Sequence, residues 1–232
     1  MNFSRFETIS FDCYGTLINW EAGILPALRS VLANHGQSLP DSDILELYGE
    51  FEFEAENPYQ RYRNVLESVV RRFGERFGFQ PSASELKSLH ESLPGWPPFE
   101  DTVAGLEKLH RRYKLAIISN IDDDLFAETQ KLLKVKFDYV ITAQQARSYK
   151  PSLNNFRLAL ERIGTGPERL LHAAQSVYHD VVPAQSLGIA TVWVNRQSAR
   201  PGVGAVRKAE ATPDLEVADL ATLAGMAKVE LG

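Results

Sequence analysis

Unbroken apolar segments alternate with segments of helical periodicity over the second half of the chain. Strands are expected where apolar residues run together, at 114–119, 138–142, 170–176 and 190–194. Helices are expected between and before them, at about 100–112, 123–133, 152–163 and 180–187. A further strand is predicted near the start, at residues 6–11. Alternation of strand and helix is typical of a parallel sheet with helices on both faces.

The pattern changes between residues 20 and 93, which hold long helical patterns and no convincing strand. The polar residues Asp41, Ser42 and Asp43 favour the start of a helix. Within residues 59–77, apolar side chains recur at the spacing of one helix face. The first strand is therefore expected to be followed by an inserted helical domain.

The predicted organisation is one α/β core with that helical domain inserted into it. The expected boundaries are 1–18 and 94–232 for the core, and 19–93 for the insertion. No internal repeat or low-complexity segment is visible. Residues 197–208, which contain Gly, Ser and Arg, are expected to form a loop.

The composition of the chain argues against some classes of binding partner. The chain has 232 residues, 44% of them hydrophobic, and a net charge of −5, which does not suggest the basic face of a nucleic-acid-binding protein. Cys13 is the only cysteine, so no intrachain disulfide can form, as is usual in the cytoplasm. Residues 1–5 show no secretory signal, and no apolar run approaches the roughly 20 residues of a membrane span. We expect a cytoplasmic protein without nucleic-acid or membrane partners.

Polar residues follow four of the predicted strands. They are Asp12 with Thr16, Ser119 with Asn120, Lys150, and the segment from Ser176 to Asp180. Because neighbouring parallel strands end at the same sheet edge, these groups are expected to converge. An ionised aspartate at such an edge can act as a nucleophile and form a covalent ester.

The segment Asp12-Cys13-Tyr14-Gly15-Thr16-Leu17 and the three later motifs resemble the haloacid dehalogenase-like (HAD) hydrolase superfamily. The first motif looks most like the type II (S)-2-haloacid dehalogenases. The resemblance implies a Rossmann-like core, a helical cap inserted after the first strand, and a cleft between them. It also implies a small carboxylic acid substrate, no cofactor and no metal. Dimers are common in this branch, so a homodimer is an expectation.

By the same resemblance, Asp12 attacks a substrate carbon and water hydrolyses the resulting ester. Thr16, Ser119 and Lys150 would hold the nucleophile and the charged groups of the substrate, together with Asn120. A nearby ammonium favours the ionised form of Asp12. Asp180 would assist the second step, which needs a positioned water and a base.

The sequence departs from HAD phosphatases at two positions. Those enzymes carry a second aspartate two residues after the nucleophile, where this chain has Tyr14. They also hold Mg²⁺ with an acidic pair in the fourth motif, where this chain has Ser176 and keeps only Asp180. Because Mg²⁺ prefers carboxylate and other oxygen ligands, we predict a metal-independent hydrolase. A Mg²⁺-dependent phosphatase is the alternative.

The sequence also departs from dehalogenases. Val177 replaces a polar amide and His179 an aromatic residue, and the cap stretch 46–52 offers no arginine for the substrate carboxylate or halide. Arg61 and Arg63 lie nearby but do not match the motif. These changes leave open a hydrolase that opens a strained cyclic amino acid by the same chemistry, or a catalytically silent binding protein.

Several residues have both a functional and an ordinary interpretation. Tyr14, Trp20 and His179 are candidates for the pocket wall, with Ser176, but packing explains an aromatic or a lone histidine equally well. Asp180 can also cap a helix. The glutamates of residues 50–56 form either a solvated helix face or a carboxylate placed over the cleft to meet a cationic substrate.

Overall fold

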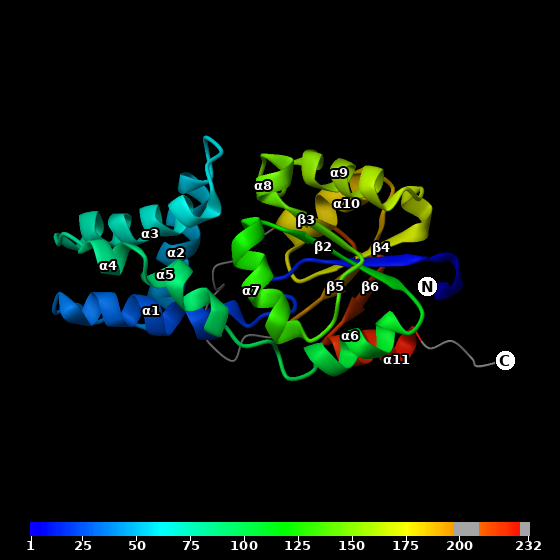
Figure 1. The fold of residues 1–232 in the computed structure, drawn as a ribbon, viewed down its shortest axis with the longest axis horizontal. Coiled ribbons are helices and arrows are strands. Elements are labelled where there is room, and N and C mark those ends of the chain that lie inside the picture. Colours follow the sequence, from blue (N-terminus) through cyan, green and yellow to red (C-terminus); the bar gives the residue numbers. More distant parts are fainter. Residues whose placement is uncertain (197–208, 228–232) are drawn as a thin grey trace.

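The computed structural model describes residues 1–196 and 209–227, so the loop expected at 197–208 lies outside the described residues. Its centre is a parallel sheet with the strand order β3-β2-β1-β4-β5-β6 (Figure 1). The strands are β1 (Thr8–Phe11), β2 (Lys114–Ser119), β3 (Tyr139–Thr142), β4 (Leu170–Ala174), β5 (Ala190–Val194) and β6 (Leu215–Val217). The predicted α/β fold class is confirmed.

Helices cover both faces of the sheet because successive side chains of a strand point to opposite sides. On β2, Leu115 and Ile117 pack in one apolar cluster, whereas Ala116 and Ile118 pack in another. The first cluster includes residues of α6 (Thr102–His110), α7 (Asp123–Leu133) and α11 (Leu220–Met226). The second includes residues of α9 (Leu153–Ile163) and α10 (Val182–Ser186), and the short helix α8 (Ala143–Ala146) lies on the same side as α9 (Figure 1).

A helical insertion follows β1 and lies to one side of the sheet (Figure 1). Its helices are α1 (Trp20–Asn34), α2 (Asp41–Ala55), α3 (Tyr62–Phe77), α4 (Ala83–Leu86) and α5 (Ser88–Ser92). The start of α2 at Asp41 agrees with the sequence prediction. Helix α3 begins at Tyr62 because Arg61, in an extended conformation, is its N-cap residue. We call this insertion the cap.

Two parts of the sheet domain differ from the sequence prediction. Strand β6 was not predicted, because three residues give too short a pattern to recognise. The predicted helix at 180–187 begins only at Val182, since Val177–Val181 form a π-helical turn before it. Among the described residues, no helix has both the length and the apolar character needed to cross a membrane.

The strand register brings the chemically important residues to one edge. Phe11, the last residue of β1, pairs with Ile117 of β2 and Ala173 of β4. Asp12 and Ser119 therefore emerge at the carboxyl edge of the sheet, close to the cap.

Candidate active site

The turn after β1 holds the Asp12 carboxylate in place. Gly15 has φ of +93°, a conformation that favours glycine, and this allows the chain to turn back. Thr16 Oγ1 donates to Asp12 Oδ2 at 2.7 Å and accepts the backbone N–H of Gln175 at 2.9 Å. Asp12 is 7% exposed. The carboxylate that the sequence predicts as the nucleophile thus accepts a hydrogen bond from a buried hydroxyl.

Lys150 is buried beside Asp12. Its Nζ donates to Asp12 Oδ1 at 2.8 Å, to Asp180 Oδ1 at 2.6 Å and to the carbonyl oxygen of Ile118 at 2.8 Å. An ammonium group has three donors, so these three acceptors saturate it. The loop that carries Lys150 is fixed by Asn120, whose side chain accepts from the Lys150 N–H at 2.7 Å and donates to the Lys150 carbonyl at 3.1 Å.

Asp180 connects this ion pair to a histidine that the sequence interpretation missed. His172 of β4 is buried, and its Nε2 lies 3.0 Å from Asp180 Oδ1 while its Nδ1 lies 2.9 Å from Ser10 Oγ. Asp180 Oδ2 is also buried and has no hydrogen-bond partner among the described residues. His172 lies within a strand, and the sequence does not indicate which side chain a residue at such a position will contact.

Asp12 and Asp180 share the Lys150 ammonium, but the pKa values of their carboxyl groups shift in opposite directions. Burial raises the pKa of Asp12, the charge of Lys150 opposes this, and the pKa stays above its ordinary value. Burial acts on Asp180 too, but Lys150 and His172 outweigh it and lower the pKa of Asp180. Burial disfavours the Lys150 ammonium, but the two carboxylates raise the pKa of Lys150 above its ordinary value. Asp180 is thus kept ionised more firmly than Asp12, so the two carboxyl groups can take different chemical roles.

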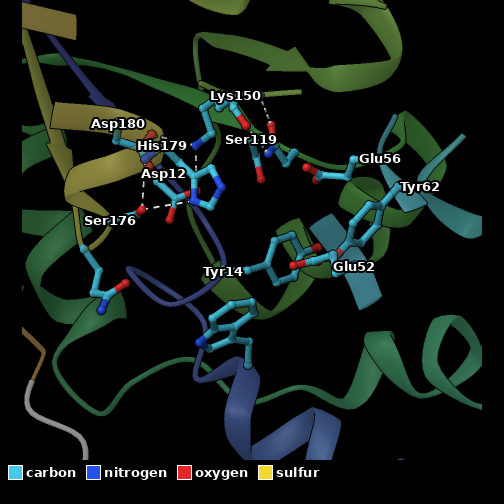
Figure 2. A pocket seen from close by; sticks show the side chains of 13 residues that line it. Asp12, Tyr14, Glu52, Glu56, Tyr62, Ser119, Lys150, Ser176, His179 and Asp180 are labelled. Carbon is cyan, nitrogen blue, oxygen red and sulfur yellow. Dashed lines mark hydrogen bonds and ion pairs between the residues drawn. The ribbon is translucent and has the colours of Figure 1, made fainter. Parts of the chain in front are cut away.

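A small pocket opens beside these groups, with about 60 Å³ of free space (Figure 2). All the predicted site residues except Thr16, which lies behind Asp12, line it. They are Asp12, Tyr14, Trp20, Ser119, Asn120, Lys150, Ser176, His179 and Asp180. The sequence therefore identified most of the lining, and the pocket suits a small molecule.

Hydrogen bonds also hold three of the lining residues, Ser176, His179 and Tyr14, in place. Ser176 Oγ accepts the backbone N–H of His179 at 3.1 Å and lies 3.0 Å from His179 Nδ1. The Tyr14 hydroxyl lies 2.7 Å from Thr129 Oγ1, so its ring rather than its hydroxyl faces the pocket. Burial raises the pKa of Tyr14 well above its ordinary value, which keeps this hydroxyl neutral.

The cap contributes residues that the sequence interpretation did not place in the site. Glu52 of α2, Glu56 just after α2, and Tyr62 of α3 line the pocket opposite Asp12 (Figure 2). The sequence shows this run of glutamates, but a solvated helix face is the more ordinary interpretation of it. Only the position of the helix in the structure decides between these two interpretations, because residues on one helix face can meet either solvent or a neighbouring domain.

Arg61 and Arg63 of the cap pair with carboxylates of the core instead. Arg61 pairs with Asp122 and Asp124 at 3.0 Å, and Arg63 pairs with Asp124 at 2.6 Å. Asp122 also accepts the backbone N–H groups of Tyr62 and Arg63 at 3.1 Å each. These contacts tie the start of α3 to the start of α7 and leave both arginines outside the pocket lining.

Comparison with known proteins gives a family match over most of the chain. The family model described as haloacid dehalogenase-like hydrolase matches residues 9–194. An (S)-2-haloacid dehalogenase of Pseudomonas sp. (strain YL) is 25% identical over 223 residues, covering 91% of this chain and 90% of that protein. A glyceraldehyde 3-phosphate phosphatase of Methanothermobacter thermautotrophicus is 27% identical over 176 residues, covering 74% and 76%.

The fold is shared with a solved structure. The L-2-haloacid dehalogenase of Xanthobacter autotrophicus superposes with a TM-score of 0.80 at 22% identity, covering 95% of this chain and 98% of that one. At this identity the likeness concerns the fold, so the chemistry has to be argued from the residues in the pocket.

Proposed function

This chain belongs to the haloacid dehalogenase-like hydrolase family, and from that premise we propose that it hydrolyses a bond at a carbon atom of a small carboxylic acid, as the 2-haloacid dehalogenases do. Asp12 is the nucleophile, and the bond broken is carbon–halide. The observation that carries the proposal is the position of Lys150 Nζ, between Asp12 at 2.8 Å and Asp180 at 2.6 Å. Tyr14 further supports it, because it stands where a phosphatase would have an acid.

The first step is a displacement. An oxygen of the ionised Asp12 carboxylate bonds to the substrate carbon, and the bond from that carbon to the leaving group breaks with the electron pair going to the leaving group. The product of this step is an ester of Asp12. Thr16 and Lys150 keep the carboxylate oriented, which reduces the entropy cost of reaching the transition state.

The second step is ester hydrolysis. Water attacks the Asp12 carbonyl carbon and gives a proton to Asp180, whose carboxylate keeps one unpaired oxygen. The bond between that carbonyl carbon and the ester oxygen then breaks, the departing alkoxide takes the proton, and the hydroxy acid leaves. Asp12 returns as a carboxylate that now holds an oxygen from water. In sum, one water and one carbon–halide bond give an alcohol, a halide and a proton.

The test is a single turnover in ¹⁸O-water with enzyme in excess over 2-chloropropionate. The label is expected in Asp12, detected by mass spectrometry of the peptide, and not in the first equivalent of product. Label in the product with none in Asp12 would mean that water attacks the substrate directly. Asp12→Asn is the control and should release no halide. If no member of a panel of haloacids and cyclic amino acids is turned over, a catalytically silent binding role replaces this proposal.

A Mg²⁺-dependent phosphatase is the second candidate, because phosphatases are among the relatives. Its metal would need carboxylate ligands, yet Asp12 and Asp180 both already bind the Lys150 ammonium. In the described residues, no three His, Cys, Asp or Glu side chains are grouped to hold a metal ion. These residues do not fit the ion well, and no step above uses one.

The remaining expectations stay predictions of the same proposal. They are the domain boundaries at 18/19 and 93/94, a cytoplasmic location, the absence of a cofactor, and a homodimer. Opening of a strained cyclic amino acid stays an alternative, since it would use the same displacement and the same ester.

A further inference from the structure

The cap side of the pocket is acidic. Its polar lining residues are Glu52, Glu56 and Tyr62, and no arginine or lysine of the described cap lines it. On the core side, the only lysine or arginine among the described lining residues is Lys150, which Asp12, Asp180 and a carbonyl oxygen already saturate. The described lining thus has four carboxyl groups and one ammonium group.

Glu52 is held rigidly by two buried tyrosines. Its Oε1 accepts from the hydroxyl of Tyr48 at 3.0 Å and from the hydroxyl of Tyr62 through a short hydrogen bond. The two hydroxyls lie 3.0 Å apart. In the described part of the chain, no cationic side chain forms an ion pair with Glu52. The carboxyl group is therefore oriented by neutral donors and lacks a counter-charge of its own.

Ser119 gives an independent sign that this space receives a ligand. Its hydroxyl is buried, with the residue 1% exposed, and it has no hydrogen-bond partner among the described residues. Figure 2 shows the Ser119 side chain directed into the space between Asp12 and the Glu52 side of the pocket. Buried polar groups are normally paired, so an orphan hydroxyl in a pocket indicates a partner that arrives from outside.

Charge decides what that partner should carry. Burial raises the pKa of Glu52, because an ionised carboxylate is costly without a cation nearby. A substrate with only a carboxylate would add negative charge to this pocket. A substrate that also carries an ammonium group would neutralise Glu52, and the rings of Tyr14, Trp20 and Tyr62 would favour the same cation.

We propose that Glu52 of the cap binds an ammonium group of the substrate, so that the physiological substrate is a small amino-acid-like molecule with a positively charged nitrogen. This inference rests on the proposed function, since it places that nitrogen at the cap end while Asp12 attacks a carbon at the core end. The nitrogen belongs either to a strained ring or to an open-chain amine beside the leaving group. Both share the chemistry that Glu52 recognises.

The test measures binding without turnover, by calorimetry on the Asp12→Asn variant. The first pair of probes is azetidine-2-carboxylate and cyclobutanecarboxylate, which share the carboxylate and the four-membered ring and differ in the ring nitrogen. The second pair is 3-amino-2-chloropropionate and 2-chlorobutyrate, in which an ammonium replaces a methyl group. We expect the member with the ammonium group to bind about 10- to 100-fold more tightly in at least one pair, as a charge-assisted hydrogen bond predicts. The pair that shows this preference tells whether the nitrogen belongs to a ring or to an open-chain amine.

Adding Glu52→Gln, which keeps the size of the side chain, should abolish this preference. Adding Glu50→Gln is the matched control, because Glu50 is exposed on the same helix and lies outside the pocket lining. Equal affinity within both pairs would overturn the inference, and this comparison does not require the Glu52 variant to fold. A preference that survives Glu52→Gln in a folded variant would overturn it too.

The two proposals fail separately. If ¹⁸O never enters Asp12 while the probes with an ammonium group are preferred, the covalent route is wrong and the ammonium site stands. If the ester forms while the probes with and without the ammonium group bind equally, the reaction stands and the ammonium site is wrong.

Discussion

Lys150 Nζ lies 2.8 Å from Asp12 Oδ1, although 138 positions separate the two residues in the chain. The same nitrogen binds Asp180 at 2.6 Å, and all three side chains are at least nine-tenths buried. One positive charge thus compensates two negative charges away from water. We therefore expect the stability of the fold to depend on this arrangement, and with it the reactivity proposed for Asp12.

Replacing Lys150 with methionine should destabilise the protein strongly. The variant keeps the length of the side chain but leaves two buried carboxyl groups without a cation, which costs about 3–5 kcal/mol in comparable cases. Urea unfolding followed by circular dichroism measures the free energy of unfolding. Because protonation relieves the unpaired carboxylates, the loss should be smaller in acid than at neutral pH.

The matched control is Lys131→Met. Lys131 pairs with Glu128 on the surface of α7 and its side chain is 67% exposed, so a loss of about 0–1 kcal/mol is expected. Equal losses for the two lysine variants would contradict the role given to Lys150.

Replacing Asp180 with asparagine should separate the two chemical steps. Asp12 and its orienting hydroxyl from Thr16 remain, so the ester can form, but the base that activates water is gone. General-base catalysis contributes about 10²- to 10⁴-fold, and hydrolysis should slow by that order. Mass spectrometry of the intact protein should then show Asp12 esterified with the carboxyalkyl group of the substrate. A variant that slows ester formation but never accumulates it would argue against Asp180 as the base.

The rate of ester formation should fall in acid at a pH above the ordinary Asp pKa of 3.8. Burial raises the pKa of Asp12, and only its ionised form attacks, so activity is lost as pH falls through that raised pKa. Single-turnover rates at saturating substrate give the profile. Because the pKa of Glu52 is also raised, the same profile should be recorded for Glu52→Gln, where the acid limb must persist if Asp12 causes it.

Treatment with a chelator should leave halide release unchanged, and added Mg²⁺ should not increase it. The physical reason is that the ammonium of Lys150 already occupies the position between the two carboxylates of the site. Comparing EDTA-treated and untreated enzyme on 2-chloropropionate checks this. Loss of activity that Mg²⁺ restores would favour the phosphatase alternative.

Glu85 should stabilise the cap in a pH-dependent manner. It completes a capping box with Ser82, and the backbone N–H of Ser82 with the side chain of Asn34 lowers the pKa of Glu85 to about 2. Its contribution is fully present above the ordinary value of 4.5 and is lost as pH falls towards 2. Glu85→Gln should therefore cost about 1 kcal/mol or less at neutral pH, since the site is partly exposed, and nothing near pH 2. Thermal unfolding at several pH values measures the difference.

The periodicity of the apolar residues was enough to predict the sheet domain and the presence of the cap. Strands β2 and β5 and helix α7 have the predicted bounds, because their apolar residues either run together or recur on one helix face. The sequence did not predict strand β6, because three residues are too few to show a recognisable pattern. Its place at the edge of the sheet follows from its pairing with β5.

The sequence by itself also predicted a nucleophile, Asp12, and named most of the residues that line the core side of the pocket. Asp12, Ser119 and Lys150 follow predicted strands, and strand order in a parallel sheet forces such residues to one edge. Only the tertiary structure decided what they meet. The sequence did not indicate that Lys150 would be saturated, or that His172 would contact Asp180. Nor did it decide that Glu52 would face the cleft with Tyr62, because the orientation of a helix relative to another domain depends on long-range packing rather than on local pattern.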